Sequence, residues 1–344
     1  MSNLTKKLKI IVDMNHPANV HFFKNFIWEM EKRGHEVLVT ASDKDITLDL
    51  LKKYGFKFIN MGSYGKSPAA KILNIPVMVW RMLKVSRKFK PDVFLAGSIR
   101  ASICAWLLGK KNYYFDDTVH DYYVRMYLPF VTNVYMPTCI GKDFGKKQIS
   151  HQSYHQLTHL HPNYFRPDKK VLSLYNLKEG DKFFILRFVS WQAVHDVGEK
   201  GLSYEGKIRL VKKLSESGRV LITSEEVLPK ELQQYKIKVA PEKIHSLMHY
   251  ATLVISEGGT MASEGGILGT PSILMSTLGA STISEQGKKY GLVYHIDNEK
   301  DLMKRIDLIL ANKNVKAEWA QKVKKMLQEK VDMTEILVKI IDNL

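Results

Sequence analysis

The chain has 344 residues and a mass of 39.5 kDa, too long for one ordinary domain and about right for two. Its 45% hydrophobic and 25% charged residues are typical of a globular protein. Two cysteines, Cys104 and Cys139, are too few for a disulfide framework or a thiolate zinc site. The 52 Lys and Arg residues exceed the 35 Asp and Glu residues by 17, and such a surplus attracts nucleic acid, anionic lipid or phosphorylated small molecules.

Signals for membrane insertion and secretion are missing from the sequence. It has no apolar run of about eighteen residues, the length needed to span a bilayer. The first ten residues contain neither a long apolar region nor a cleavage site. We therefore expect a cytoplasmic enzyme or binding protein.

The first half of the chain alternates short apolar runs with helical patterns. Strands are predicted at 8–13, 36–41, 56–60, 93–96 and 113–115, and helices at 20–33, 47–54, 69–89 and 98–108. Repeated β–α units of this length predict a parallel sheet with helices on both faces.

The alternation restarts after residues 151–181, a stretch rich in His, Pro and Asn that shows no clear period. Strands are predicted at 183–189, 219–223, 253–256, 272–275 and 292–295, helices at 206–217 and 244–250, and a basic, mostly helical tail at 299–344. We predict an α/β fold of two tandem Rossmann-like, doubly wound domains, 1–160 and 161–344, with a cleft between them. In such sheets ligands bind beyond the carboxyl ends of the strands.

The most informative local pattern lies at 256–271. It follows a predicted strand and opens a helix, and it contains Ser256, Gly258, Gly259, Thr260 and Glu264. The glycines let the backbone approach an anion, free amides at the helix start can hold a diphosphate, and Glu264 can accept bonds from a ribose diol. The structural alternative is a tight turn with close helix–sheet packing. We favour phosphate binding, because strand, glycines, hydroxyl and carboxylate occur in the right order.

Polar residues also cluster after the first strand: Asp13, Asn15, His16 and His21. A histidine at this turn can act as a general base, because its ordinary pKa lies near neutrality. The alternatives are that His16 caps a turn and that His21 packs beside Phe22.

Two further strand ends carry candidate residues. Arg187 can contact phosphate as a rigid fork, and Trp191, His195 and Asp196 follow it in an expected loop. The alternative is that Trp191 packs between the domains, and we favour the functional interpretation. Asp116 and Asp117 follow the strand at 113–115 and either contact an acceptor or cap the next helix.

Two tempting patterns predict less. Residues 60–67 resemble a Walker A loop, but Asn60 stands where its first glycine is required; Gly62, Gly65, Lys66 and Ser67 either form a polar lip or make a plain turn. Four histidines have spacing that would place them on one helix face, but no acidic residue accompanies them, and we expect no metal site: His151, His155, His159 and His161.

The expected helix at 69–89 is basic and amphipathic, and it carries Trp80. Such a helix can lie on an anionic membrane surface, which suits a transferase acting on a lipid-linked glycan. The alternative is an ordinary helix that covers the sheet and exposes its lysines.

Four parts of the sequence carry a family resemblance. Residues 16–24 with 31–41, residues 187–196 and residues 256–264 resemble the DUF354 family of predicted glycosyltransferases, as does the stretch 161–168. More distantly, the sequence is similar to GT-B glycosyltransferases such as MurG and to the non-hydrolysing UDP-N-acetylglucosamine 2-epimerases.

The resemblance implies a GT-B fold with the acceptor on the amino-terminal domain, the donor on the carboxyl-terminal domain, and a last helix that packs back on the first domain. The donor would be a nucleotide-diphosphate sugar such as a UDP-sugar. Ser256, Gly258, Gly259 and Thr260 would hold its diphosphate and Glu264 its ribose. Arg187, Trp191 and His195 are further candidates on the donor side. Gly65, Lys66, Asp116 and Asp117 would lie on the acceptor side. We expect no metal cofactor, because helix dipoles and Arg187 can stabilise the departing diphosphate.

The reaction stays open to two alternatives. An epimerase shares the fold and the donor, but its His-Arg-x-Glu-Asn and Gly-Asp-Thr blocks are missing from the sequence. A non-catalytic polyanion-binding or nucleic-acid-binding protein would explain the charge, but no nucleic-acid module is recognised and the basic residues are spread along the chain.

Overall fold

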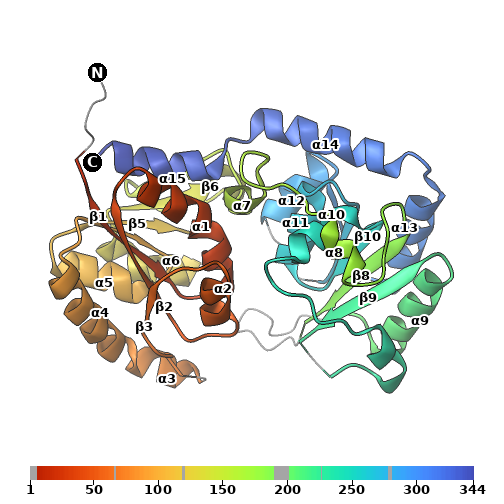
Figure 1. Ribbon diagram of the computed structural model, residues 1–344, viewed down its shortest axis with the longest axis horizontal. Helices are drawn as coiled ribbons and strands as arrows, with labels where there is room; N and C mark the ends of the chain where they lie inside the picture. Colours follow the sequence, from red (N-terminus) through yellow and green to blue (C-terminus); the bar gives the residue numbers. More distant parts are fainter. Residues whose placement is uncertain (1–5, 66, 118–120, 190–200, 226, 278–280) are drawn as a thin grey trace. The chain divides into compact units, whose positions relative to one another are not determined.

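The computed structural model describes residues 6–65, 67–117, 121–189, 201–225, 227–277 and 281–344 (Figure 1). The chain divides into two compact units: unit 1 is Met1–Tyr164 with Val331–Leu344, and unit 2 is Phe165–Lys330. Each unit is built around a parallel sheet.

Unit 1 contains a seven-stranded parallel sheet in the order β3-β2-β1-β4-β5-β6-β7. Its strands are β1 (Lys9–Met14), β2 (Glu36–Ala41), β3 (Phe58–Asn60), β4 (Val93–Ala96), β5 (Lys111–Phe115), β6 (Asn133–Pro137) and β7 (Gln148–His151). Its helices are α1 (Pro17–Lys32), α2 (Thr47–Lys53), α3 (Pro68–Leu73), α4 (Ile75–Phe89), α5 (Ile99–Leu107), α6 (Asp121–Tyr127), α7 (Leu157–Leu160) and α15 (Met333–Asp342), with short 3-10 turns at Leu128–Phe130 and Thr138–Ile140.

Helices cover both faces of this sheet, because successive side chains along its strands point to opposite sides. On one face Ile11 and Phe94 pack with Met82 of α4 and Cys104 of α5. Helix α1 contacts β1 and β2 and packs beside α15 (Figure 1).

Unit 2 contains a five-stranded parallel sheet in the order β12-β11-β10-β8-β9. Its strands are β8 (Phe183–Phe188), β9 (Arg219–Ser224), β10 (Leu253–Ser256), β11 (Ser272–Met275) and β12 (Val293–Ile296). Its helices are α8 (Lys170–Ser173), α9 (Tyr204–Ser215), α10 (Ile244–Tyr250), α11 (Gly259–Ile267), α12 (Ser281–Lys288), α13 (Glu299–Ala311) and α14 (Val315–Glu329), with a 3-10 helix at Lys230–Tyr235.

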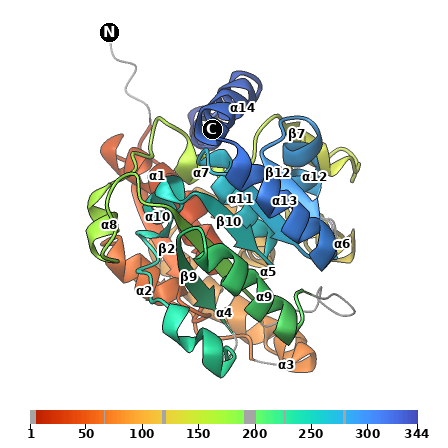
Figure 2. The same cartoon turned by 90° about the vertical axis from the view of Figure 1, so that its right-hand side faces the viewer.

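One core of unit 2 lies between its sheet and two helices. Leu210 of α9 and Ile306 of α13 join Phe184, Ile255 and Ile273 of the strands (Figure 2). Helix α11 contacts β10, β11 and β12. The predicted fold of two tandem Rossmann-like domains is confirmed.

The structure differs from the predicted elements in one helix and in two additional strands. The single helix expected at 69–89 is two helices, because Pro76 has no N–H to bond the carbonyl of Ile72 and its ring clashes with that carbonyl. Strands β6 and β7 were not predicted, and β7 occupies the start of the expected connector. Its middle residues, Ile149 and Ser150, are exposed, and Ile149 stands alone among polar residues, so β7 lacks the apolar run of a central strand.

Residues 331–344 were assigned to the second domain, with the last helix expected to pack back on the first. They group with unit 1, and α15 packs beside α1. Asp332 caps α15 by accepting from the backbone of Thr334, and the Thr334 hydroxyl donates to the Thr158 carbonyl over 3.0 Å. Leu337 of α15 is fully buried.

In the part of the chain that the structure describes, no helix has both the length and the apolar composition needed to cross a membrane.

Candidate functional site

Each sheet has one point where the strand order reverses, between β1 and β4 in unit 1 and between β8 and β10 in unit 2. The loops that leave these neighbouring strands run to opposite faces, so a crevice opens at the carboxyl ends of the pair. Asp13 lies at the first switch point, and Arg187 and Ser256 lie at the second. These three candidates therefore lie where a doubly wound sheet binds its ligand.

A buried charge network occupies the switch point of unit 1. Asp13 and Arg100 are both fully buried, and Arg100 Nη2 lies 2.6 Å from Asp13 Oδ1. The hydroxyls of Thr40 and Ser98 also donate to the Asp13 carboxylate, and Arg100 donates to Ser42. Burial lowers the pKa of Arg100, but the Asp13 carboxylate and Tyr64 together outweigh burial, and the net direction of the pKa shift is upward.

The network reaches the loop after β3. The Tyr64 ring faces the Arg100 guanidinium, with 5.6 Å from its centroid to Cζ. Burial raises the pKa of Tyr64 to about 12, so its phenol stays protonated at neutral pH. Asp13 is thus the anchor of a fixed polar cluster, and its two carboxylate oxygens are occupied by protein donors.

His16 and His21 stand on either side of the start of α1. His16 is the N-cap: its Nδ1 accepts from the Ala18 N–H over 3.2 Å, as the capping alternative predicted. Its Nε2 lies 4.0 Å from Asp45 Oδ2. Because Nδ1 accepts, the proton of the neutral ring is on Nε2, and the ring must release its cap before it can take up another proton.

His21 lies one turn into α1, where its Nδ1 is 3.3 Å from the Tyr54 hydroxyl. Its ring also lies 5.3 Å from that of His159, a residue of the same unit. His21 is therefore held among aromatic side chains.

The predicted acceptor-side residues do not form one cluster in the structure. Asp116 is buried and accepts from the Tyr127 hydroxyl over 2.5 Å, while Asp117 lies 3.4 Å from His155 Nδ1. Gly65 has φ +96°, and a Cβ there would come within 2.9 Å of Ala70 Cβ, so the turn requires glycine. Lys66 lies outside the described residues.

The four histidines do not share a helix face. His151 ends β7, His155 lies in a turn, His159 is in α7 and His161 follows it. The spacing predicted a helix that the chain does not form.

In unit 2, the turn from β10 to α11 presents backbone amides. Ser256 ends β10, and its hydroxyl accepts from the Gly258 N–H over 3.0 Å. Gly258 is the N-cap, Gly259 begins the helix and Thr260 is exposed. Among the residues that the structure describes, no side chain caps this helix start. The first N–H groups of a helix lack intrahelical partners, and together with the helix dipole they favour an anion at this position.

Glu257 fixes the surroundings of this turn. It is buried, its Oε2 accepts from the Val189 N–H over 3.0 Å, and its Oε1 accepts from the Leu202 N–H over 2.9 Å. The ammonium of the buried Lys207 lies 3.7 Å from the same Oε1. A Cβ at Gly201 would overlap Glu257 Oε1, so this position requires glycine. One carboxylate therefore ties two strand-end loops together.

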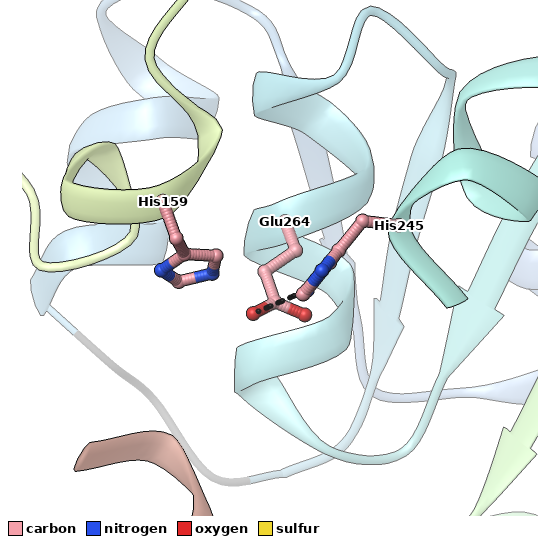
Figure 3. A group of neighbouring side chains, drawn as sticks. All are labelled: His159, His245 and Glu264. Carbon is pink, nitrogen blue, oxygen red and sulfur yellow. Dashed lines mark ion pairs between the residues drawn. The ribbon is translucent and has the colours of Figure 1, made fainter. Parts of the chain in front are cut away.

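Glu264 follows one turn into α11 and pairs with His245 of α10. His245 Nε2 lies 3.2 Å from Glu264 Oε1, and both residues are buried. Figure 3 shows the two side chains reaching toward each other from neighbouring helices. The carboxylate is thus oriented by an imidazole while lying near the free helix start.

Arg187 lies near the carboxyl end of β8, opposite Ser256 of β10. It forms an ion pair with Glu225, which follows β9. Its guanidinium is partly exposed and can meet an anion if that pair rearranges. Trp191, His195 and Asp196 lie outside the described residues.

Comparison with known proteins places the chain in a family. Residues 8–344 match the family model described as "Protein of unknown function (DUF354)". The chain belongs to this family. A relative with 22% identity over 279 residues is the uncharacterized protein MJ0665 of Methanocaldococcus jannaschii, and the match spans 77% of this chain and 81% of the relative.

Solved structures with the same fold have lower sequence identity to this DUF354 protein. The UDP-GlcNAc 2-epimerase from Neisseria meningitidis bound to UDP-GlcNAc has 13% identity and a TM-score of 0.67, over 98% of this chain and 100% of that chain. The spinosyn rhamnosyltransferase SpnG has 13% identity and a TM-score of 0.64, with the same coverage. SpnG complexed with thymidine diphosphate has a TM-score of 0.63, over 98% and 100%. These likenesses show the fold.

Sequence reasoning missed three site residues of this DUF354 protein: Arg100, His245 and Glu257. Glu257 directly follows the buried strand β10, and Arg100 lies at the start of α5, just beyond the buried strand β4. Both were visible in the sequence as charged residues near strand ends. His245 left no local signal, because its partner lies on a different helix.

Proposed function

We propose that this protein is a GT-B glycosyltransferase that moves a sugar from a nucleotide-diphosphate sugar to a glycan or lipid-linked acceptor. The observation that carries the proposal is the free start of α11 at the switch point of unit 2, with the buried Glu264–His245 pair one turn away. The helix start suits a diphosphate, and a carboxylate at that distance suits a ribose diol.

The donor's nucleotide is a UDP or TDP-like group in this proposal. The neighbours SpnG and the Neisseria epimerase, whose structures contain thymidine diphosphate and UDP-GlcNAc, support that class of ligand. The chemistry follows from charge: the diphosphate leaves with added negative charge, and the α11 amides and Arg187 would stabilise it without a metal ion.

Donor binding is tested by calorimetry with UDP and TDP. Glu264→Ala is expected to weaken binding by about 10- to 100-fold, because a hydrogen bond to a charged group contributes about 1.5–3 kcal/mol. Glu216→Ala removes an exposed carboxylate at the carboxyl end of α9 and serves as the control. Unchanged affinity in Glu264→Ala would remove Glu264 from the donor site.

His16 and His21 are the two candidates for the base that deprotonates the acceptor hydroxyl. His16→Asn separates its two roles, because Asn is a good N-cap and has no titrating ring. If His16 is the base, this variant keeps its melting temperature and loses transfer by about 100-fold or more. Full turnover in both His16→Asn and His21→Gln would refute both assignments.

An epimerase is the second candidate function, since the neighbours with this fold include UDP-GlcNAc 2-epimerases. Incubation with UDP-GlcNAc and no acceptor separates the two reactions. An epimerase changes the sugar at C2, whereas a transferase leaves the donor unchanged until an acceptor is added.

A further inference from the structure

Helices α3 and α4 of unit 1 expose an apolar stripe. Ile72 and Leu73 of α3 are exposed, with 76% of Leu73 open, and Val77 and Trp80 continue the stripe along α4. The packed side of α4 is the opposite one, where Met82 is fully buried. Monomeric proteins rarely expose adjoining apolar side chains without a binding role.

The chain around this stripe is strongly basic. Residues 50–115 contain thirteen Lys and Arg residues and one carboxylate, Asp92, so this segment carries 12 of the 17 surplus charges. On α4 the stripe runs into the exposed Lys84, Arg87 and Lys88, and the Lys84 ammonium lies 3.9 Å from the centroid of the Trp80 ring. We call the exposed side chains of residues 71–88 the α3–α4 surface.

We propose that the α3–α4 surface docks on an anionic lipid bilayer. A bilayer meets both halves of the surface at once: its acyl boundary takes the aliphatic side chains and Trp80, and its phosphates meet the Lys and Arg heads. Binding of this kind needs no spanning helix, because the apolar face enters only the headgroup region.

A nucleic acid and a second copy of the chain are each less suited to the α3–α4 surface than a bilayer. A nucleic acid neutralises the basic side chains but leaves Ile72 and Leu73 without an apolar partner. A second copy joined by a two-fold axis would place this basic face against itself, and the like charges would repel. Both are outcomes that the experiment below detects.

Hydrogen bonds connect helix α4 and the residue before it to the loop after β3, which reaches the switch point of unit 1. Arg81 Nη1 donates to the Met61 carbonyl over 2.8 Å, and Asn74 Nδ2 donates to the Tyr64 carbonyl over 3.0 Å. Tyr64 in turn faces Arg100. Docking therefore brings the bilayer to the acceptor-side edge of this sheet. Resting on the proposed function, this identifies the acceptor as lipid-linked, with its headgroup at the bilayer surface.

Co-sedimentation of the full chain with vesicles tests the docking. We expect binding to vesicles of phosphatidylcholine with phosphatidylglycerol, little binding to phosphatidylcholine alone, and release at about 1 M salt, where the Debye length is about 3 Å. Leu73→Ser/Trp80→Ser should lower the partition coefficient by about tenfold or more, and Lys84→Gln and Lys88→Gln by about fivefold each.

Matched controls come from exposed residues of unit 2. Leu308→Ser on α13 and Lys212→Gln on α9 remove an apolar side chain and a charge and should leave the partition coefficient unchanged. Melting temperatures of all variants should match the wild type, since the altered side chains are exposed.

Two results would overturn the proposal: no binding of the wild type to anionic vesicles, or equal binding by Leu73→Ser/Trp80→Ser. Binding of a short RNA that vesicles do not displace, or concentration-dependent dimers lost in that variant, would assign the surface to those occupants instead. Glu264→Ala should co-sediment with anionic vesicles as the wild type does, because Glu264 is not part of the α3–α4 surface. A failure of donor binding can therefore be distinguished from a failure of docking.

Discussion

The buried Asp13–Arg100 pair shows what a single residue does for unit 1. Both charges are removed from water, and Thr40, Ser98 and Ser42 supply the hydrogen bonds that make this burial tolerable. The pair joins the carboxyl end of β1 to the start of α5. Its main contribution is therefore to fix the geometry of the switch point.

Removing one partner leaves an uncompensated buried charge. Arg100→Leu is expected to lower the free energy of unfolding by about 3–5 kcal/mol, measured by urea denaturation. Arg33→Leu breaks exposed pairs with Glu29 and Asp342 and should cost about 1 kcal/mol or less. Asp13→Leu/Arg100→Leu should be more stable than Arg100→Leu alone, and similar losses for Arg100→Leu and Arg33→Leu would contradict the argument.

His35 gives unit 1 a dependence on pH. Its Nδ1 accepts from the Leu8 N–H over 3.2 Å, which requires an unprotonated nitrogen, and burial lowers its pKa below 6.5. Just below pH 6.5 the unfolded chain therefore binds a proton that the folded chain does not. Stability rises with pH across this window and is lost as pH falls through it.

The matched variant is His35→Asn, because its amide oxygen can accept the same bond and does not titrate. Urea denaturation should give free energies of unfolding within about 1 kcal/mol of each other at pH 8. Below pH 6.5 the wild type should lose stability more steeply than the variant. Parallel profiles would show that His35 is not the titrating group.

At the scale of the element, the Glu257 side chain connects loops that the hydrogen bonds within the sheet do not reach. It accepts backbone N–H groups from Val189, which follows β8, and from Leu202, which precedes α9, and so ties both residues to the turn after β10 at the switch point. The negative charge is balanced by Lys207.

Glu257→Gln keeps the shape of the side chain but turns one acceptor into a donor that faces an N–H group. We expect a loss of about 2–4 kcal/mol in the free energy of unfolding, and a loss of the same sign in Gly201→Ala, whose methyl group would displace the carboxylate. Glu216→Gln alters an exposed carboxylate and should stay within about 0.5 kcal/mol of the wild type. A neutral Glu257→Gln would contradict this role.

The elements predicted from sequence are those with a local signature. The strands β1, β4, β8 and β10 are continuous apolar runs, as buried parallel strands must be, and the glycines at 258–259 mark the turn before α11. β7 is an exposed edge strand and has no such run. The site partners depend on register: Arg100 reaches Asp13 across 87 residues of sequence, and no local pattern encodes that pairing.

For the whole molecule, the chain crosses between its units twice, and the second crossing returns α15 to unit 1. Unit 2 is one continuous segment, whereas unit 1 needs its final residues. Met333, Leu337 and Ile341 of α15 are buried, and each such side chain contributes about 1.5–3 kcal/mol. Their sum is comparable to the whole stability of a domain, about 5–15 kcal/mol.

Ending the chain at residue 330 should therefore unfold unit 1 and leave unit 2 folded, giving a single thermal transition by circular dichroism. Joining 6–164 to 331–344 by a short Gly-Ser linker should restore unit 1, because Asn163 Nδ2 lies 2.9 Å from Asp332 Oδ2 and the two ends already meet. Leu337→Asp in that joined chain is the control and should abolish the recovery, since it buries a charge in place of the apolar contact. A cooperative transition of 6–164 alone would show that α15 is dispensable and that its burial adds stability without being required for the fold.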